Sequence, residues 1–542
     1  MKRSIVLQSE LLCDKKIVSE GKKYSSGSVA KSAAIIMVAG LLSKLLGFLR
    51  ELLIGTKFGA TNITDAYLVS LTVPTVIFAT VAGALATTFI PVYSKIAAKK
   101  GEQKAIYFTQ NLFNVVLVIS LVISIGGAIF ARPLVKLVAM GFEGNTLEMA
   151  VNFTRITMFI CISLGLTNIL TGFLQSHQQF AIPATVNIIF NVIVIGSLIL
   201  NSVFGIWGLV VASVLGFTAQ IFIQLPSAMK NGFRFGGKPD FFDKDLIRMG
   251  TLVIPVVIGT GVSTINTLVD RMMASFLAEG SISALNFANR LNFFALGLFI
   301  SPITTVIYPT LSKFSAEKDV NTFKNTLNRV TGIVIAVIMP VMTGAIILRV
   351  PIIRFLFERG AFDQRATYMT ATALLFYSIG MVGIGIREVL NRGFYSLQDT
   401  KTPMINGAIA MIINIILNLI LVRFMGIGGL ALSTSISAII CTVMLFYSLR
   451  KKIGPLGGKK IIETLFKSGL ACLIIGVVVH FTYNYMSTIF GTEGIIYQAL
   501  DLAVAVLVGA LIYIITCVLF KVNEVFWMAN LLRKKISKRI AI

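Results

Sequence analysis

Charged residues are scarce in this sequence. Only 13% of the 542 residues are Asp, Glu, Lys or Arg, whereas 56% are hydrophobic, and soluble domains carry about twice that charged fraction. The two histidines, His177 and His480, lie far apart, and we find no glycine-rich phosphate loop and no nucleophile–base pair. These absences argue against an enzyme and against transport driven by ATP hydrolysis within this chain. They favour an integral membrane protein.

Cysteine is also rare. Four of the five cysteines fall within apolar segments and lack the spacing of a metal site: Cys161, Cys441, Cys472 and Cys517. We interpret them as packing residues, and we expect no organic cofactor.

Long apolar runs are what the sequence has in abundance. An apolar run of about 20 residues can cross a bilayer as a helix. Fourteen such runs occur, at approximately 30–54, 65–92, 108–131, 149–171, 181–203, 206–229, 247–276, 284–310, 328–349, 368–392, 404–424, 428–449, 461–486 and 497–520. The sequence therefore predicts an all-α polytopic membrane protein of about 14 transmembrane helices.

The first twelve spans form two copies of one six-helix unit. Residues 132–137 (RPLVKL) return as 350–355 (VPIIRF), and residues 89–95 (FIPVYSK) return as 307–313 (IYPTLSK), in both cases 218 positions later. A period of this length indicates a duplicated lobe rather than a solenoid. An even number of spans gives both lobes the same orientation, so we expect a direct repeat related by an axis along the membrane normal.

This repeat gives the predicted domain organisation. We expect a flexible cytoplasmic tail at 1–29, followed by a first lobe at 30–230 and a second lobe at 231–450. A pair of additional helices follows at 451–522, and a basic cytoplasmic tail at 523–542.

The net charge of +25 is mainly a topology signal. Lys and Arg cluster at 95–104, 230–248, 313–329, 450–460 and 533–539. All these clusters lie on one side if every span crosses, and the positive-inside rule makes that side cytoplasmic. We therefore predict a multi-pass protein with both termini inside. Basic loops here favour contact with anionic membrane lipids over nucleic acid.

Ionisable residues also occur inside the predicted spans, where they usually face a bundle interior or a wet cavity. Lys44, Arg50 and Glu51 share a polar face of the first span, and Arg271, Arg290 and Arg387 lie in spans seven, eight and ten. Because the arginine fork donates two hydrogen bonds to one phosphate, these residues favour an anionic headgroup, particularly a pyrophosphate. For Arg50 and Glu51, adjacent residues on a helix do not face each other, so we expect a poor pair.

A second group of polar residues is rich in oxygen. Asp270 lies on span seven, Asn414 and Asn418 share one face of span eleven, and Thr434 lies on span twelve. One carboxylate with neutral oxygen ligands suits a hard monovalent cation, so we hypothesise a Na⁺ site. The alternative is a set of interhelical hydrogen bonds, which are common in membranes.

Several motifs resemble the MurJ (MviN) family of lipid II flippases, within the multidrug/oligosaccharidyl-lipid/polysaccharide exporter superfamily. The matching stretches are 43–51 (SKLLGFLRE), 172–177 (GFLQSH), 288–291 (ANRL), 357–362 (FERGAF) and 394–403 (FYSLQDTKTP), within a similarity covering about 30–520. The resemblance implies fourteen helices, with the last two shaping a lipid-facing groove. It also implies that Arg50 and Arg290 correspond to arginines that line the central cavity in the family.

The same resemblance implies the function. The substrate would be an undecaprenyl-pyrophosphate-linked peptidoglycan precursor, moved from the inner to the outer leaflet of the bacterial cytoplasmic membrane by alternating access. Cell-wall synthesis machinery would be an expected partner. Residues 73–79 lack an arginine that the family commonly has, which keeps open a flippase for another polyprenyl-linked glycan. A cation-coupled drug exporter and a non-transporting scaffold are further alternatives.

Overall fold

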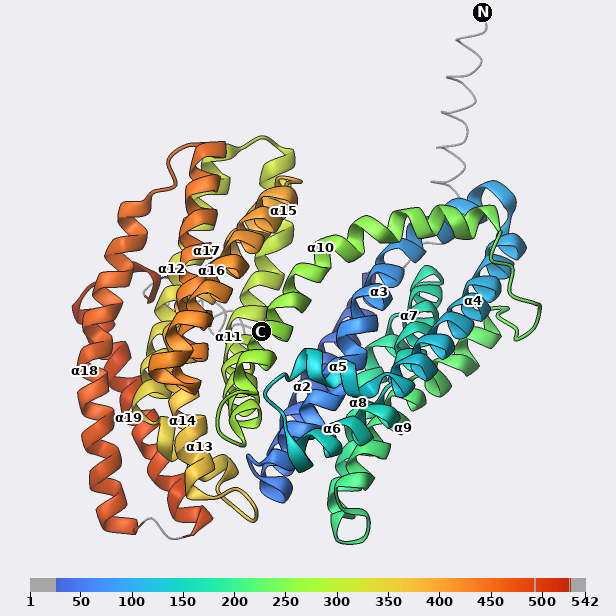
Figure 1. Cartoon of the computed structure of the whole chain (residues 1–542). Coiled ribbons are helices and arrows are strands. Elements are labelled where there is room, and N and C mark those ends of the chain that lie inside the picture. The colour runs from blue at the N-terminus through green and yellow to red at the C-terminus, as the bar shows by residue number, and fades with distance from the viewer. Residues whose placement is uncertain (1–25, 492–493, 526, 528–542) are drawn as a thin grey trace, which may run out of the picture.

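The computed structural model describes residues 26–491, 494–525 and 527, which fold into helices without strands (Figure 1). Most of the two predicted tails therefore lies outside the described residues. The first bundle consists of α2 (Ser26–Phe58), α3 (Asn62–Lys100), α4 (Glu102–Ile129), α5 (Ala131–Val138), α6 (Gly144–Thr157), α7 (Ile160–Ser176), α8 (Ala181–Ile199) and α9 (Asn201–Lys230).

The second bundle repeats this order of elements. It consists of α10 (Lys244–Ala274), α11 (Ser281–Ala316), α12 (Val320–Ile347), α13 (Arg349–Phe357), α14 (Gln364–Ile379), α15 (Met381–Ser396), α16 (Lys401–Met425) and α17 (Ile427–Ile453). Two further helices, α18 (Gly458–Phe490) and α19 (Ile495–Leu519), pack beside α12 at the edge of the molecule (Figure 1). Helix α10 arches from the first bundle to the second and packs against both α3 and α16.

The membrane class is confirmed. Within the described residues, eleven helices are long and apolar enough to cross a membrane, or twelve if α14 and α15, bent by 45°, count as one span. The two other predicted spans fall in the long helices α2 and α10, and fourteen crossings remain a prediction.

Backbone features recur between the two bundles. The short helices α5 and α13 occupy equivalent places. Gln178 (φ 60°) recurs 220 positions later as Gln398 (φ 58°), and Gly205 (φ 55°) recurs 221 positions later as Gly426 (φ 52°). A positive φ is unfavourable for residues other than glycine, so its recurrence at Gln178 and Gln398 agrees with the predicted repeat. The rotation axis that relates the lobes remains a prediction.

The most specific motif, residues 394–403, forms the turn between α15 and α16. After Gln398, the Asp399 carboxylate accepts a hydrogen bond from the Thr402 backbone N–H (3.0 Å) and pairs with Lys452 on α17 (2.6 Å). The bond from Lys452 lowers the pKa of Asp399 to about 2, so this turn keeps its charge pair at neutral pH. The motif therefore ties three helices together.

Small residues let the helices approach closely within each bundle. A Cβ atom at Gly172 would lie 2.8 Å from the Phe89 ring, and one at Gly216 would lie 2.8 Å from the Phe190 ring. Close packing of this kind drives helix association in lipid.

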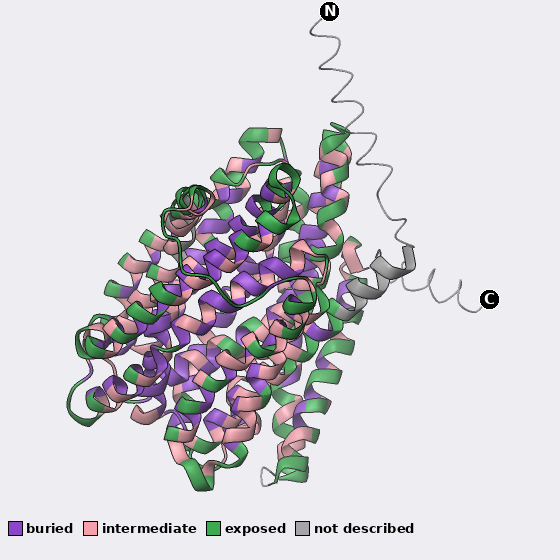
Figure 2. Cartoon of the chain, turned by 90° about the vertical axis from the view of Figure 1, so that its right-hand side faces the viewer, coloured by how far each residue is buried: buried purple, intermediate pink, exposed green. Residues whose placement is uncertain are grey.

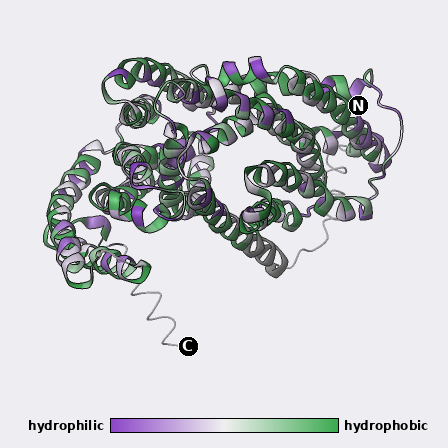
Figure 3. Ribbon diagram, turned by 60° about the horizontal axis from the view of Figure 1, so that its bottom comes forward, coloured by the Kyte–Doolittle hydropathy of each residue, from purple (hydrophilic) through white to green (hydrophobic). Residues whose placement is uncertain are grey.

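Figure 2 shows buried residues running through the interior of the molecule, and Figure 3 shows hydrophobic residues dominating the helices, as a lipid environment requires.

The two bundles meet at one end of the molecule, here called the contact end, and are splayed at the other (Figure 1). At the contact end the Asp65 carboxylate accepts hydrogen bonds from the backbone N–H groups of Gly280 (2.8 Å) and Ser283 (2.7 Å), and from the Ser283 hydroxyl. The Ala361 N–H donates to the Thr56 carbonyl (2.9 Å). The opposite end carries the Lys- and Arg-rich connections and is called the basic end.

Candidate functional site

A cavity of about 420 Å³ lies between the two bundles. Helices α2, α3, α8 and α9 of the first bundle and α10 and α11 of the second supply its walls. Its lining contains Arg50, Glu51, Ile54, Tyr67, Leu68, Leu71, Thr72, Thr75, Val76, Phe190, Phe217, Thr264, Thr267, Arg271, Asn286 and Arg290. Four of the six residues predicted to bind the substrate are therefore brought together.

Glu51 is the centre of this constellation. Its carboxylate accepts a hydrogen bond from Arg50 Nη2 (2.7 Å) and another from Asn286 Nδ2 on α11 (3.1 Å). Arg290 Nε, also on α11, lies 3.6 Å from Glu51 Oε1. Because Glu51 is only 3% exposed, its charge depends on these partners. The ion pair and hydrogen bond join the two bundles across the cavity.

The expectation that Arg50 and Glu51 pair poorly was wrong. Their long side chains converge although the residues are adjacent, because Arg50 is also held from the first bundle. Arg50 Nη1 donates to Asn191 Oδ1 on α8 (3.1 Å), and the guanidinium lies 5.1 Å from the centre of the Phe190 ring. Asn191 Nδ2 in turn donates to the Ser43 carbonyl (3.2 Å). Arg50 is thus held in a fixed orientation beside the cavity.

Two buried arginine nitrogens of the residues that line this cavity have no hydrogen-bond partner within the part of the chain that the structure describes. These are Arg50 Nε and Arg271 Nη1. A buried donor without an acceptor is costly, so both positions would be stabilised by a bound anion. Arg290 differs, because its side chain is 58% exposed and its guanidinium has access to water. The arrangement offers three guanidinium groups around one cavity, with one carboxylate to balance them.

Lys44 and Arg387 lie elsewhere. Lys44 is exposed on α2, and a Cβ atom at Gly297 of α11 would lie 3.5 Å from its amine. Phe48 and Phe294 stack on the same seam between α2 and α11, with ring centres 4.6 Å apart. Arg387 lies on α15 beside Cys441 of α17. Neither cation lines the cavity described above, so the arginine cluster is smaller than the sequence predicted.

An apolar groove lies on the other side of α11. It has a volume of about 550 Å³ and lies between α11, α12, α18 and α19. Leu291 and Ala295 line it from α11, immediately after Arg290 in the sequence, and Tyr513 and Val506 line it from α19. One helix therefore presents charge to the cavity and hydrocarbon to the groove.

The proposed cation ligands are partly assembled. Asn418 Nδ2 donates to Asp270 Oδ1 (2.6 Å) and to Asn414 Oδ1 (3.0 Å). The Thr434 hydroxyl instead donates to the Leu430 carbonyl of its own helix (3.1 Å), and no described contact joins it to Asp270. Asn266 takes its place in the cluster, with Nδ2 lying 3.4 Å from Asp270 Oδ2.

The polar atoms of this cluster fit a small cation. The buried oxygens Asn418 Oδ1 and Asn266 Oδ1 accept no hydrogen bond from a described residue. Amide oxygens of this kind are suitable ligands for a hard cation, although the Nδ2 group of each amide is the one that faces the Asp270 carboxylate. The described residues contain no group of three His, Cys, Asp or Glu side chains able to hold a metal ion.

Three amide side chains were missing from the sites predicted from the sequence. Asn286 binds Glu51, Asn191 orients Arg50, and Asn266 contacts Asp270. Each lies on a polar face of its span, which was a usable signal. Asn286 and Asn191 lie more than 100 positions from their partners in the sequence, whereas Asn266 lies one turn before Asp270. Sequence spacing alone could not identify these pairs.

These features define a polytopic membrane transporter, with an arginine-lined cavity between two helical bundles. A solved inward-facing multidrug resistance transporter of the MATE family, in the MOP superfamily, shares the fold at 14% identity, with a TM-score of 0.62 over 78% of this chain and 98% of that one. More specifically, the chain belongs to the lipid II flippase MurJ family, whose sequence profile matches residues 54–521.

Individual relatives agree with this assignment. A probable lipid II flippase MurJ of Vibrio cholerae is 30% identical over 437 residues, covering 78% of this chain and 83% of the relative. One from Rickettsia prowazekii is 28% identical and covers 91% of this chain and 98% of its own. A solved lipid II flippase MurJ in an inward closed conformation has a TM-score of 0.75 at 27% identity, over 90% of this chain and 98% of that one. The resemblance recognised in the motifs is confirmed.

Proposed function

We propose that this protein moves lipid II, the undecaprenyl-pyrophosphate-linked peptidoglycan precursor, from the inner to the outer leaflet of the bacterial cytoplasmic membrane. The observation that carries the proposal is the convergence of Arg50, Arg271 and Arg290 from both bundles on one cavity. Membership of the lipid II flippase family supports the same substrate. No covalent chemistry is required, because the lipid changes leaflet and is not altered.

The arginines would bind the pyrophosphate. Arg50 Nε and Arg271 Nη1 are buried donors that need an acceptor, and a pyrophosphate supplies several oxygens in the geometry that the guanidinium fork prefers. Glu51 occupies Arg50 and Arg290 in the structure. The substrate would compete with this carboxylate, so Glu51 limits how tightly the head is held and favours its release.

The lipid tail would stay out of the polar cavity. The apolar groove between α11, α12, α18 and α19 suits a polyprenyl chain, and α11 separates it from the cavity by one helix. Arg290 and Leu291 are adjacent residues that serve the two compartments. The lipid would connect the two compartments through the seam between α2 and α11, where Phe48 stacks on Phe294.

Alternating access would follow from opening and closing the two ends. The contact end is held by Asp65 and the loops around Gly280 and Ala361, and the basic end is splayed. With the basic loops on the cytoplasmic side, both termini lie inside and the cavity faces inward. The outward-facing state requires these contact-end hydrogen bonds to break.

A Na⁺ ion held by Asp270, Asn414, Asn418 and Asn266 fits the orphaned amide oxygens of the second bundle. When bound, the ion would supply a positive charge that neutralises Asp270. The ligands lie on α10 and α16, so the cluster couples these two helices. An ion can favour one state of the cycle only if its affinity differs between the states.

Reconstitution in liposomes tests the proposal. The purified protein would be offered a panel of polyprenyl-pyrophosphate glycans and a cationic drug, and transfer between leaflets would be scored. We expect transfer of lipid II above the others. Preferred transfer of a different glycan would select a related flippase, drug movement alone would select an exporter, and no transfer would support a scaffold. Association with cell-wall synthesis enzymes would be tested separately, by crosslinking in cells.

A further inference from the structure

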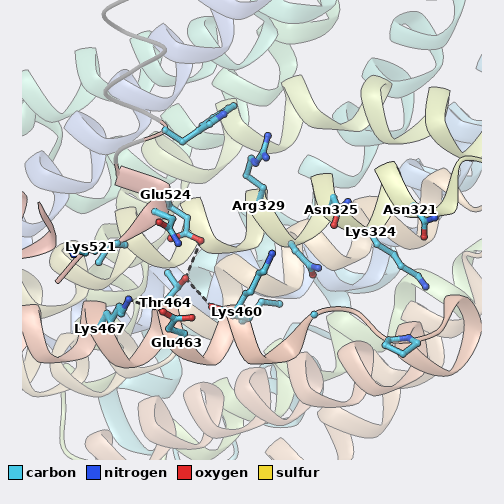
Figure 4. A pocket seen from close by; sticks show the side chains of 17 residues that line it. Asn321, Lys324, Asn325, Arg329, Lys460, Glu463, Thr464, Lys467, Lys521 and Glu524 are labelled. Carbon is cyan, nitrogen blue, oxygen red and sulfur yellow. Dashed lines mark hydrogen bonds and ion pairs between the residues drawn. The ribbon is translucent and has the colours of Figure 1, made fainter.

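A second polar cavity lies at the basic end, far from the arginine cluster. It has a volume of about 860 Å³ and is enclosed by the first turns of α12, the first turns of α18 and the segment that follows α19 (Figure 4). It shares no lining residue with the central cavity. The transport cycle proposed above gives it no role.

The lining of this cavity is strongly basic. Lys324, Arg329, Lys460, Lys467 and Lys521 face two carboxylates, Glu463 and Glu524, which gives five positive and two negative charges and a net charge of +3. Like charges gathered in one cavity repel each other. An anion in the cavity would relieve this repulsion.

Both carboxylates already have partners. Glu463 pairs with Lys467 of its own helix (2.7 Å). Glu524 accepts a hydrogen bond from the Thr464 hydroxyl (3.1 Å), and its side chain packs where a Cβ atom at Gly332 would lie. Within the described part of the chain, the four other cations of the lining make no ion pair. The residues of the cavity therefore leave a net charge of +3 unbalanced.

Neutral donors accompany the cations. Asn321, Asn325 and Asn328 line the cavity from α12, and Figure 4 shows Lys460 extending from α18 toward α12. Helix α18 begins after Gly457 without a side-chain cap, so its first backbone N–H groups add to the positive potential. Several cations with amide and backbone donors form an environment that suits the oxygens of a phosphate group.

The surroundings suggest where such a phosphate would come from. Arg329 lies over the Trp527 ring, 5.4 Å from its centre, and tryptophan is enriched at membrane–water interfaces. On the same turns of α18, Ile462 (67% exposed) and Phe466 (66% exposed) face outward, as lipid-facing residues do. A lipid headgroup could occupy the cavity while its acyl chains remain beside α18. Basic pockets between membrane helices bind anionic headgroups in this manner.

We infer that this basic cavity is a binding site for a phosphate-bearing anion, which bridges α12 and α18 at the basic end. The shared chemistry is the phosphate, carried either by an anionic phospholipid of the adjacent leaflet or by a soluble phosphate compound. Its occupant would fix the position of α18 relative to the second bundle. The inference does not depend on what the central cavity transports.

Tryptophan fluorescence gives a direct test, because the chain has only two tryptophans. In the full-length Trp207→Phe protein, Trp527 is the remaining fluorophore, at the wall of the cavity. The protein would be titrated with inorganic pyrophosphate in detergent. It would also be placed in nanodiscs containing brominated phosphatidylglycerol or brominated phosphatidylcholine. The site variant is Lys324→Gln with Lys460→Gln, and the matched control is Lys95→Gln with Lys99→Gln, two exposed lysines at the same end of the first bundle.

We expect a saturable change in Trp527 emission that the site variant weakens at least tenfold and the control pair leaves unchanged. Stronger quenching by brominated phosphatidylglycerol than by brominated phosphatidylcholine identifies the lipid headgroup, and a response to pyrophosphate alone identifies a soluble anion. Equal quenching by both lipids without a pyrophosphate response would overturn the inference. So would a response that persists in a monodisperse site variant.

Discussion

The carboxylate of Glu51 on α2 lies 3.6 Å from the guanidinium of Arg290 on α11, across the boundary between the two bundles. Asn286, one turn before Arg290, donates to the same carboxylate. A single buried acid therefore both balances the arginines of the cavity and connects the halves of the molecule that must move apart. Any anion that binds the arginines would also weaken this connection.

Substitution of Glu51 by Gln should tighten headgroup binding and slow transport. The amide keeps the shape of the side chain but no longer competes as an anion for Arg50 and Arg290. We expect soluble pyrophosphate to bind on the order of tenfold more tightly, while lipid II transfer in liposomes falls because release is slower. Isothermal titration and a transfer assay on the same preparation would measure both. Weaker pyrophosphate binding in this variant would contradict the role given to Glu51.

Substitution of Asp65 by Asn should open the contact end. The Asp65 carboxylate caps the N-terminus of α11 from the other bundle, through Gly280 and Ser283, and hydrogen bonds to a charged group contribute about 1.5–3 kcal/mol each. We expect a longer distance between spin labels placed at the exposed residues Glu143 and Glu279.

The matched control for Asp65 is Asp319→Asn. Asp319 caps its own helix through Thr322 (3.0 Å), so its loss should leave the distance between the bundles unchanged. An unaltered label distance in Asp65→Asn would show that other contacts hold this end closed.

Na⁺ should stabilise the protein relative to choline, and the effect should disappear in Asp270→Ala. The carboxylate is the only charged ligand of the cluster, so its removal leaves amides alone. Thermal unfolding in the two salts would measure the difference. Asp501→Asn is the control, because Asp501 is a buried carboxylate of α19 with no hydrogen-bond partner among the described residues. A Na⁺ effect that survives unchanged in Asp270→Ala would place the ion elsewhere. No Na⁺ effect at all would favour a structural polar cluster.

Cysteine labelling in cells should report cytoplasmic access at Ser312 and external access at Glu493. Ser312 lies near the basic end of α11, and Glu493 falls in the connection between α18 and α19, outside the described residues. The asymmetry of Lys and Arg between the two ends motivates the expectation. The reverse pattern of labelling would invert the topology and would make the cavity face outward.

The sequence predicted the helices well because a membrane span can be recognised from its apolar composition alone. Even the equivalent turns at Gln178 and Gln398 follow the repeat period. The polar partners were harder to predict. Arg50 and Glu51 are adjacent, and helical geometry alone argues against their pairing. The pairing depends on Asn191, 141 positions after Arg50, and on Asn286, 235 positions after Glu51.

Arg387 was predicted to line the cavity and does not, and the reason is again that the sequence does not show which neighbours a polar side chain faces. A cation within a span can face either a shared cavity or the interior of its own bundle, and both options give the same polar face in the sequence. Arg387 lies beside Cys441, inside the second bundle. Thr434 likewise satisfies its hydroxyl within its own helix, an option that is always open to threonine in membrane helices.

Transfer of lipid II by arginine variants tests the central claim most directly. Arg50→Ala and Arg290→Ala should abolish transfer in liposomes while the proteins insert and remain folded, and Lys at either position should restore only part of the rate, because a point charge replaces a fork. Arg387→Ala, which removes an intramembrane arginine outside the cavity, should retain most of the wild-type rate. Wild-type transfer by both Arg50→Ala and Arg290→Ala would contradict the account.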